Sequence, residues 1–127
     1  MARRTRTNRT AREFPRTVRL NQLFQEILAE ELERIDDERL ELVTIMSVDV
    51  DGDLSRAVVY FDTLGGEDDD ADVLEALAEL RYRLQGAIGR EARVKRTPEL
   101  VFRPDDVGRS AARLEEVLRS IHDEDLS

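Results

Sequence analysis

The sequence predicts an α+β fold in which a three-stranded sheet is backed by helices, in the order helix, strand, strand, helix, strand, helix. Two observations predict it. Residues 40–61 read as two strands that fold back on each other at Asp51-Gly52-Asp53, where Asp-Gly tolerates the positive φ angles of a tight hairpin turn. Apolar residues recur at helical spacing on both sides of this hairpin. Because an isolated hairpin is only marginally stable in water, we expect the helices and a third strand to cover it.

Length and composition limit the class of protein. At 127 residues the chain is expected to form one domain with a single core. It contains no cysteine, which excludes a disulfide scaffold, a thiol nucleophile and a cysteine zinc site. No apolar run approaches the roughly 20 residues that a membrane-spanning helix needs. We therefore expect a soluble, cytoplasmic protein with no membrane partner.

Charge is unevenly distributed along the chain. The net charge of −9 by itself argues against nucleic acid, because phosphate binding depends on Lys and Arg. Residues 1–19, however, carry seven arginines against one acid, and residues 81–103 carry seven basic side chains against two acids. Two basic segments on an acidic body indicate a localised contact with an anionic partner.

Both ends of the chain are expected to be disordered. Residues 1–15 lack apolar periodicity and form a basic tail, and residues 123–127 form an acidic C-terminus. Three interpretations of the tail are open: an organelle transit peptide, a solvated segment without a partner, or an arm that contacts phosphate and orders on binding. We favour the arm, because the amphipathic apolar face of a transit peptide is missing.

The first helix is expected to begin at Thr17, whose hydroxyl can cap it. Arg16 and Arg19 lie at its start, where the helix dipole disfavours cations, so a surface contact explains them better than helix stability does. The acidic stretch of residues 30–33, which includes Glu31, is expected to be a solvated face. The core face is formed by Leu20, Leu23, Phe24, Ile27, Leu28 and Ile35.

The segment after the hairpin, residues 65–70, reads as a flexible acidic connector. Its carboxylates, like those of residues 49–53, lack the alternating ligand spacing and the late bidentate Glu of a calcium loop. No metal site is expected at either place.

Apolar spacing over residues 73–88 predicts one continuous helix, capped by Asp70 or Asp72. Near its end stands Gly86-Ala87-Ile88-Gly89, which fits the GxxG loop of a KH domain. It also fits a helix that ends at Gly89 as its C-cap, and this second interpretation is favoured because a strand follows directly.

The remaining chain predicts a third strand and a last helix. Residues 93–102 form the strand, with Val94, Leu100 and Phe102 in the core and Pro98 at an edge or bulge. The helix starts at Pro104-Asp105-Asp106, and its apolar stripe is expected to pack on the body. Dimerisation through this helix is a minor alternative. The stripe consists of Val107, Ala111, Leu114, Val117, Leu118 and Ile121.

Catalytic chemistry is not indicated. The single histidine, His122, stands near a polar C-terminus without an acid–base partner at a suitable spacing. No nucleophile-elbow, zinc-protease, Walker A or dinucleotide-binding motif occurs. We expect a protein that is not an enzyme and needs no cofactor.

Several separated blocks carry a family resemblance, and their order and spacing together are specific. Over about residues 15–121 the chain resembles bacterial ribosome-binding factor A. The blocks are Arg16-Thr17-Val18-Arg19, Gln25-Glu26-Ile27-Leu28-Ala29, Asp37-Glu38-Arg39-Leu40, Val43-Thr44-Ile45, Asp53-Leu54-Ser55-Arg56-Ala57 with Val59-Tyr60, and Thr97-Pro98-Glu99-Leu100-Val101-Phe102.

The resemblance implies a type II KH-like domain over residues 16–122, with the order α-β-β-α-(α)-β-α. It also implies an assembly factor that binds the small (30S) ribosomal subunit and assists late maturation of 16S rRNA. We expect the protein to be a monomer. Phosphate-directed charges then fall, by position, on Arg16, Arg19, Arg83, Arg90, Arg93, Lys95 and Arg96.

The chain departs from the family pattern at two places. The Ala-x-Gly kink of the family aligns with Leu80-Arg81-Tyr82, which contains neither Gly nor Pro, and Glu38 stands where the family usually has Pro. The alternative function is an acidic protein–protein adaptor without direct RNA binding, whose contacts would come from acids such as Glu30, Glu31 and Glu33.

Overall fold

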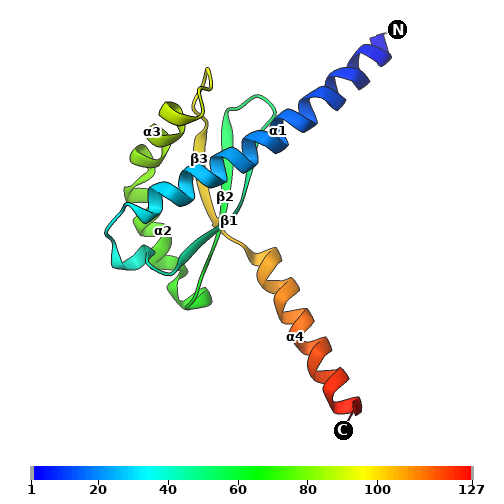
Figure 1. The fold of residues 1–127 in the computed structure, drawn as a ribbon, viewed down its shortest axis with the longest axis vertical. Helices are drawn as coiled ribbons and strands as arrows, with labels where there is room; N and C mark the ends of the chain where they lie inside the picture. The colour runs from blue at the N-terminus through cyan, green and yellow to red at the C-terminus, as the bar shows by residue number, and fades with distance from the viewer. Residues whose placement is uncertain (1, 127) are drawn as a thin grey trace.

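A computed structural model gives the backbone of residues 2–126 and the side chains of residues 16–124 (Figure 1). It confirms the α+β fold. The elements follow the order α1 (Ala2–Glu33), η1 (Glu38–Leu40), β1 (Val43–Val50), β2 (Arg56–Thr63), η2 (Gly66–Asp69), α2 (Asp70–Glu79), α3 (Arg81–Glu91), β3 (Glu99–Pro104) and α4 (Asp106–Leu126), where η marks a short 3₁₀ turn.

The sheet has the strand order β1-β2-β3. β1 and β2 are antiparallel with Val48 opposite Val59, and a bulge shifts the register between Ile45 and Ser47. β2 and β3 are parallel, so α2 and α3 form the crossover between them.

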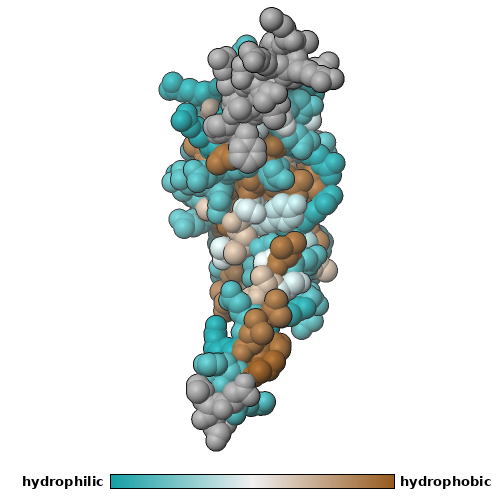
Figure 2. All heavy atoms as spheres, turned by 90° about the vertical axis from the view of Figure 1, so that its right-hand side faces the viewer, coloured by the Kyte–Doolittle hydropathy of each residue, from teal (hydrophilic) through white to brown (hydrophobic). Residues whose placement is uncertain are grey.

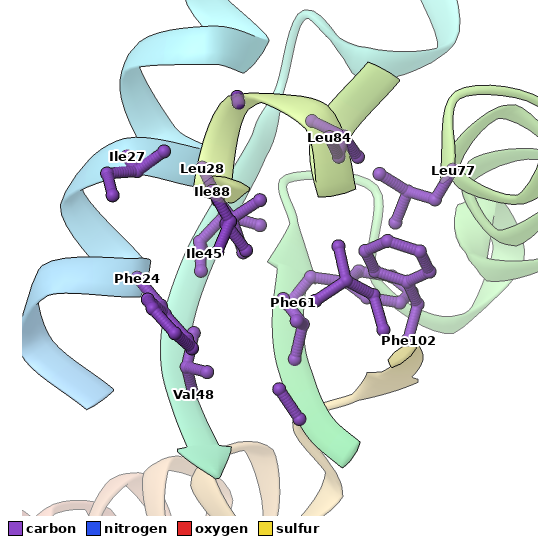
Figure 3. Close-up of a cluster of buried hydrophobic side chains, with 14 of the residues drawn as sticks. Phe24, Ile27, Leu28, Ile45, Val48, Phe61, Leu77, Leu84, Ile88 and Phe102 are labelled. Atoms are coloured by element: carbon purple, nitrogen blue, oxygen red, sulfur yellow. The ribbon is translucent and has the colours of Figure 1, made fainter. Parts of the chain in front are cut away.

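The core lies between the sheet and the helices α1, α2 and α3 (Figure 1). Alternate residues of β2 are buried, among them Val59 and Phe61. They share this core with Phe24 from α1 and Ile88 from α3, both fully buried (Figure 3). The helical spacing of the first helix therefore predicted its core face correctly at Phe24, Ile27 and Leu28.

Side chains from the helices form hydrogen bonds with backbone groups at both edges of the sheet. The backbone N–H of Val50 donates to Asn21 Oδ1 over 2.8 Å, and Gln25 Nε2 donates to the carbonyl of Ile45 over 3.2 Å. On the opposite edge, the N–H of Leu100 donates to Gln85 Oε1 over 3.2 Å. These contacts occupy backbone groups that would otherwise be open to pairing with another strand.

The hairpin loop differs from the expected tight turn. It spans residues 51–55, and the positive φ falls on Leu54 (60°), not on Gly52. The N–H of Leu54 donates to the carbonyl of Asp51 over 2.9 Å. Leu54 is half-buried against the core, and we attribute the unusual backbone of a leucine to this packing, which a Gly at the same place could not supply.

The expected single helix over residues 73–88 is wrong, because the chain breaks at Leu80 between α2 and α3. Leu80 has φ −97° and ψ 3°, outside the helical range. Both helices contact β3, but α2 packs against η1 whereas α3 packs chiefly against α1. The break coincides with the position of the family's kink and forms without Gly or Pro.

Three further expectations about helix ends are corrected. Gly89 lies inside α3, which ends at Glu91 with Ala92 as its C-cap, so Gly86-Ala87-Ile88-Gly89 is neither a loop nor a cap. The cap of α2 is Asp69, whose side chain makes no capping hydrogen bond, rather than Asp70 or Asp72. Thr17 lies within α1 instead of at its start.

The third strand is shorter than expected. It begins at Glu99, so residues 93–98 form a loop. Pro98 is fully buried directly before the strand, where its missing N–H removes no bond from the ladder.

The expectation that α4 packs on the body is wrong. Its stripe residues Val107, Leu114, Val117, Leu118 and Ile121 are 51–82% exposed, and α4 projects from the body (Figure 1). The first turn explains this direction. Asp105 caps the helix by accepting a hydrogen bond from the N–H of Gly108 over 3.1 Å, and its own N–H donates to the carbonyl of Phe61 over 2.8 Å.

The segments for which we expected disorder fall largely within the bounds of α1 and α4. The side chains of residues 1–15 and 125–127 lie outside the described part of the chain. The domain limits at residues 15 and 122, and the role of the basic tail, stay predictions. None of the helices described between residues 2 and 126 has the length and apolar character to cross a bilayer.

Candidate nucleic-acid interface

Three segments meet at the end of the sheet that carries the hairpin loop, residues 51–55 (Figure 1). α1 reaches it through the hydrogen bond between Asn21 and Val50. β3 starts beside it, because the N–H of Glu99 donates to the carbonyl of Ser55 over 3.0 Å. We call this region the hairpin end.

Four of the seven predicted site residues lie close together at the hairpin end, in the segment 90–96. Arg90 is in the last turn of α3, and Arg93, Lys95 and Arg96 are in the loop that follows. All four side chains are exposed, and within residues 16–124 none of them forms an ion pair. With the exposed acid Glu91 included, the segment carries a net charge of +3 at the surface.

The shape of this segment follows from how α3 ends. The N–H of Ala92 closes the last turn on the carbonyl of Ile88 over 2.9 Å, and Arg93 then adopts a φ of 52°. That left-handed conformation stops a helix, but it is normally supplied by Gly, and it costs another residue about 1–2 kcal/mol. The chain then returns across α3 so closely that a Cβ on Gly89 would lie 3.1 Å from Thr97 Oγ1.

Arg16 and Arg19 are exposed on α1. Arg19 stands two residues before Asn21, which places it near the end of β1. The structure thus brings two basic groups, one from α1 and one from the segment 90–96, to the same end of the molecule (Figure 1).

Arg83 is separated from this group and has a partner. Its Nε donates to Glu31 Oε1 over 2.9 Å, and Glu31 is only 6% exposed. The hydrogen bond from Arg83 holds the pKa of Glu31 below its ordinary value of 4.5, although burial alone would raise it. The expectation that Glu31 belongs to a solvated acidic face is therefore wrong, and the half-exposed Arg83 is paired with an acid of its own protein.

The hairpin end also carries acids. Asp49, Asp51 and Asp53 are exposed there. Asp53 Oδ1 accepts hydrogen bonds from the hydroxyl and the N–H of Ser55 over 2.7 and 3.1 Å, which lowers its pKa, and the charge of Arg96 adds to the effect. The hairpin loop therefore places negative charge beside the basic segment 90–96.

Sequence reasoning missed one exposed aromatic residue. Tyr82 is 87% exposed and stands at the break between α2 and α3. Beside it, Arg81 Nε is buried and has no hydrogen-bond partner among the described side chains of residues 16–124. The outward position of Tyr82 follows from helical spacing along α3, because Leu84 and Ile88 occupy its inner face.

Comparison with known proteins agrees with this architecture. A family model described as ribosome-binding factor A matches residues 16–118. The chain belongs to the ribosome-binding factor A family. A relative of that name from Rubrobacter xylanophilus is 36% identical over 111 residues, which cover 87% of this chain and 90% of the relative.

Solved structures of the ribosome-binding factor A family share the fold. The crystal structure of ribosome-binding factor A from Thermus thermophilus aligns with a TM-score of 0.63 at 33% identity, over 69% of this chain and 94% of that one. A homology model of the Thermus thermophilus protein, fitted into the cryo-EM map of a 30S–RbfA complex, aligns with a TM-score of 0.55 at 35% identity, over 65% and 88% of the two chains.

Proposed function

We propose that the chain is a cytoplasmic, non-catalytic assembly factor that binds the small ribosomal subunit and assists late maturation of 16S rRNA. Membership of the ribosome-binding factor A family supports this function, as does the alignment with a relative fitted into a 30S complex. The single observation that carries the proposed site is the segment 90–96, whose four basic side chains are exposed and unpaired within the described residues.

The proposed contacts position the protein on rRNA without reading its sequence. Arg90, Arg93, Lys95 and Arg96 act as phosphate-directed charges, and Arg16 and Arg19 extend the contact along α1. The rest of the body is acidic, so it repels phosphate and confines binding to this end. We leave Arg83 out of the proposed contact, because it compensates the buried Glu31.

A charge-reversal pair tests the site. Lys95→Glu/Arg96→Glu should abolish co-sedimentation with purified small subunits, while the circular dichroism spectrum stays unchanged. The matched control is Arg103→Glu/Arg119→Glu, which changes the net charge equally at two exposed positions away from the hairpin end. Binding by wild type should weaken steeply with added salt, as phosphate contacts require. Unchanged co-sedimentation of the first variant would show that the site is elsewhere.

The role in assembly needs a test in cells. Sucrose gradients of cells without the protein should show excess free small subunits that contain unprocessed 16S rRNA. The wild-type chain should restore the profile, and Lys95→Glu/Arg96→Glu should not. A normal gradient in the deletion strain would rule out the assembly function.

One observation speaks against the alternative function, an acidic protein–protein adaptor without direct RNA binding. It relied on an acidic surface that included Glu31, and this residue is buried and paired with Arg83. Glu30 and Glu33 are exposed and stay available to such a contact.

A further inference from the structure

The strongest feature not used by the proposed rRNA contact is the apolar face of α4. It consists of Val107, Ala111, Leu114, Val117, Leu118 and Ile121. The spacing of four and three residues keeps them on one side of the helix. All are exposed, and Figure 2 shows them as a continuous apolar strip along the lower part of the molecule. Contiguous apolar surface of this kind on a charged protein marks an interaction site.

The base of α4 is fixed, so the face is presented in a defined direction. Arg109 is 9% exposed at its side chain and donates to both oxygens of Asp70 over 2.7 and 2.9 Å, and to Asp62 over 2.8 Å. Arg113 pairs with Glu67 over 2.8 Å one turn later. Four charge-assisted hydrogen bonds therefore hold the first turns against β2, η2 and α2.

The charges beside the face indicate what can cover it. α4 carries six acidic and three basic residues, and three of the acids follow Ile121 at its tip. Two of the three arginines, Arg109 and Arg113, are paired with acids of the body, so the charge that α4 itself leaves beside the face is acidic. Glu115 flanks the apolar face on one side. Asp106 flanks it on the other, where the neighbouring Arg113 is paired with Glu67. Such edges repel the phosphate backbone of RNA. They also disfavour a second copy of this chain, whose α4 would bring the same charge and whose body carries −9 overall.

We propose that the apolar face of α4 docks a basic amphipathic protein segment on the surface of the small ribosomal subunit. Proteins embedded in rRNA neutralise phosphate with Lys and Arg, so their exposed segments complement the acidic edges of α4 while their apolar residues cover Leu114 and Leu118. The chain then contacts the subunit at two places. The hairpin end binds rRNA phosphate, and the apolar face of α4 binds a protein segment. This inference rests on the proposed function and names its second partner.

The test compares two probes, purified small subunits and a 16S rRNA transcript, at one salt concentration. Leu114→Glu/Leu118→Glu should bind the transcript as wild type does and bind small subunits at least tenfold more weakly. The control Arg119→Gln/Ser120→Glu makes the same change of charge on the opposite side of α4 and should match wild type on both probes. Because Leu114 and Leu118 lie outside the core, the fold should be retained, and unchanged transcript binding demonstrates it.

The outcomes separate this inference from the function on which it rests. If wild type fails to bind small subunits, the proposed function and this inference both fail. If wild type binds and the Leu114→Glu/Leu118→Glu variant binds equally well, or loses both probes in parallel, only the docking inference is overturned.

Two measurements identify what occupies the face. A photoreactive phenylalanine analogue in place of Leu118 should cross-link in purified small subunits to a Lys- and Arg-rich peptide of a ribosomal protein, and a cross-link to 16S rRNA would overturn the proposal. Sedimentation equilibrium of the full chain should show a monomer. A dimer that Leu114→Glu/Leu118→Glu dissociates would assign the face to a second copy and overturn it too.

Discussion

Arg83 on α3 donates a 2.9 Å hydrogen bond to Glu31 on α1, across an interface in which Glu31 is almost completely buried. Arg34 approaches the second oxygen of Glu31 at 3.5 Å. An acid that the sequence places in a charged run is thus part of the packing between two helices. A basic residue in the predicted binding segment is its partner.

Removing that partner should destabilise the fold. Arg83→Ala leaves the carboxylate of Glu31 buried with only the longer contact from Arg34, and we expect a loss of about 1–3 kcal/mol in the free energy of unfolding. Denaturant melts measure it. The control Arg90→Ala removes a neighbouring exposed arginine of α3 that forms no ion pair within residues 16–124, and it should change stability little.

The same pair predicts a pH dependence. The pKa of Glu31 is lower in the folded protein than its ordinary 4.5, so the pair contributes stability above that pH. The contribution is lost as the pH falls through the lowered folded value. Wild type should therefore lose stability below about pH 4.5 more steeply than Glu31→Gln, measured by thermal melts between about pH 7 and 3. Parallel curves would mean that Glu31 titrates normally.

Arg93 should show a conflict between stability and binding. Arg93→Gly relieves the left-handed backbone and should stabilise the fold by about 1 kcal/mol. It also removes a proposed phosphate contact and should weaken rRNA binding. Lys95→Gly is the control, because it removes one charge from the same loop without a positive φ to relieve. Both variants should bind rRNA less well, and only Arg93→Gly should melt at a higher temperature.

Arg109 should determine how α4 is held. Arg109→Ala removes its hydrogen bonds to Asp62 and Asp70 and leaves two carboxylates without their shared partner, at a cost of about 2–3 kcal/mol. Hydrogen exchange in the first turns of α4 should accelerate. Arg113→Ala breaks an exposed pair with Glu67, for which a change below about 1 kcal/mol is expected. Equal effects of the two substitutions would contradict the role assigned to Arg109.

Tyr82 offers a test of a second rRNA contact. Its exposed ring at the break between α2 and α3 has the form of a platform on which an unpaired base can stack. Tyr82→Ala should leave the melting temperature unchanged and cost about 1–3 kcal/mol in binding to single-stranded rRNA, by fluorescence anisotropy. Tyr82→Phe keeps the ring and should bind as wild type does. Identical affinities for all three proteins would exclude stacking.

The sequence by itself determined the order of the strands and helices and most of the core. Apolar residues alternate along residues 42–61 and recur at helical spacing around Phe24 and Leu28. Such patterns show which side of a strand or helix is apolar, because they depend only on nearby residues of the chain. The blocks that resemble ribosome-binding factor A also depend only on residue order, and the comparisons confirmed the family.

Only the tertiary structure decided which apolar faces pack against another element and which charged side chains have an ion-pair partner. Apolar residues recur along α4 at helical spacing as they do along α1, yet α1 is covered by β1 and α3 whereas α4 is left exposed, because Arg109 and Asp105 set its direction.

Helical spacing also runs through Leu80 without a sign of the break, since the partners of α2 and α3 lie far away in sequence. Likewise the arginines at 83 and 93 look alike in sequence. Arg83 is paired with an acid 52 residues away. Arg93 lies in the loop after α3 and forms no ion pair within residues 16–124.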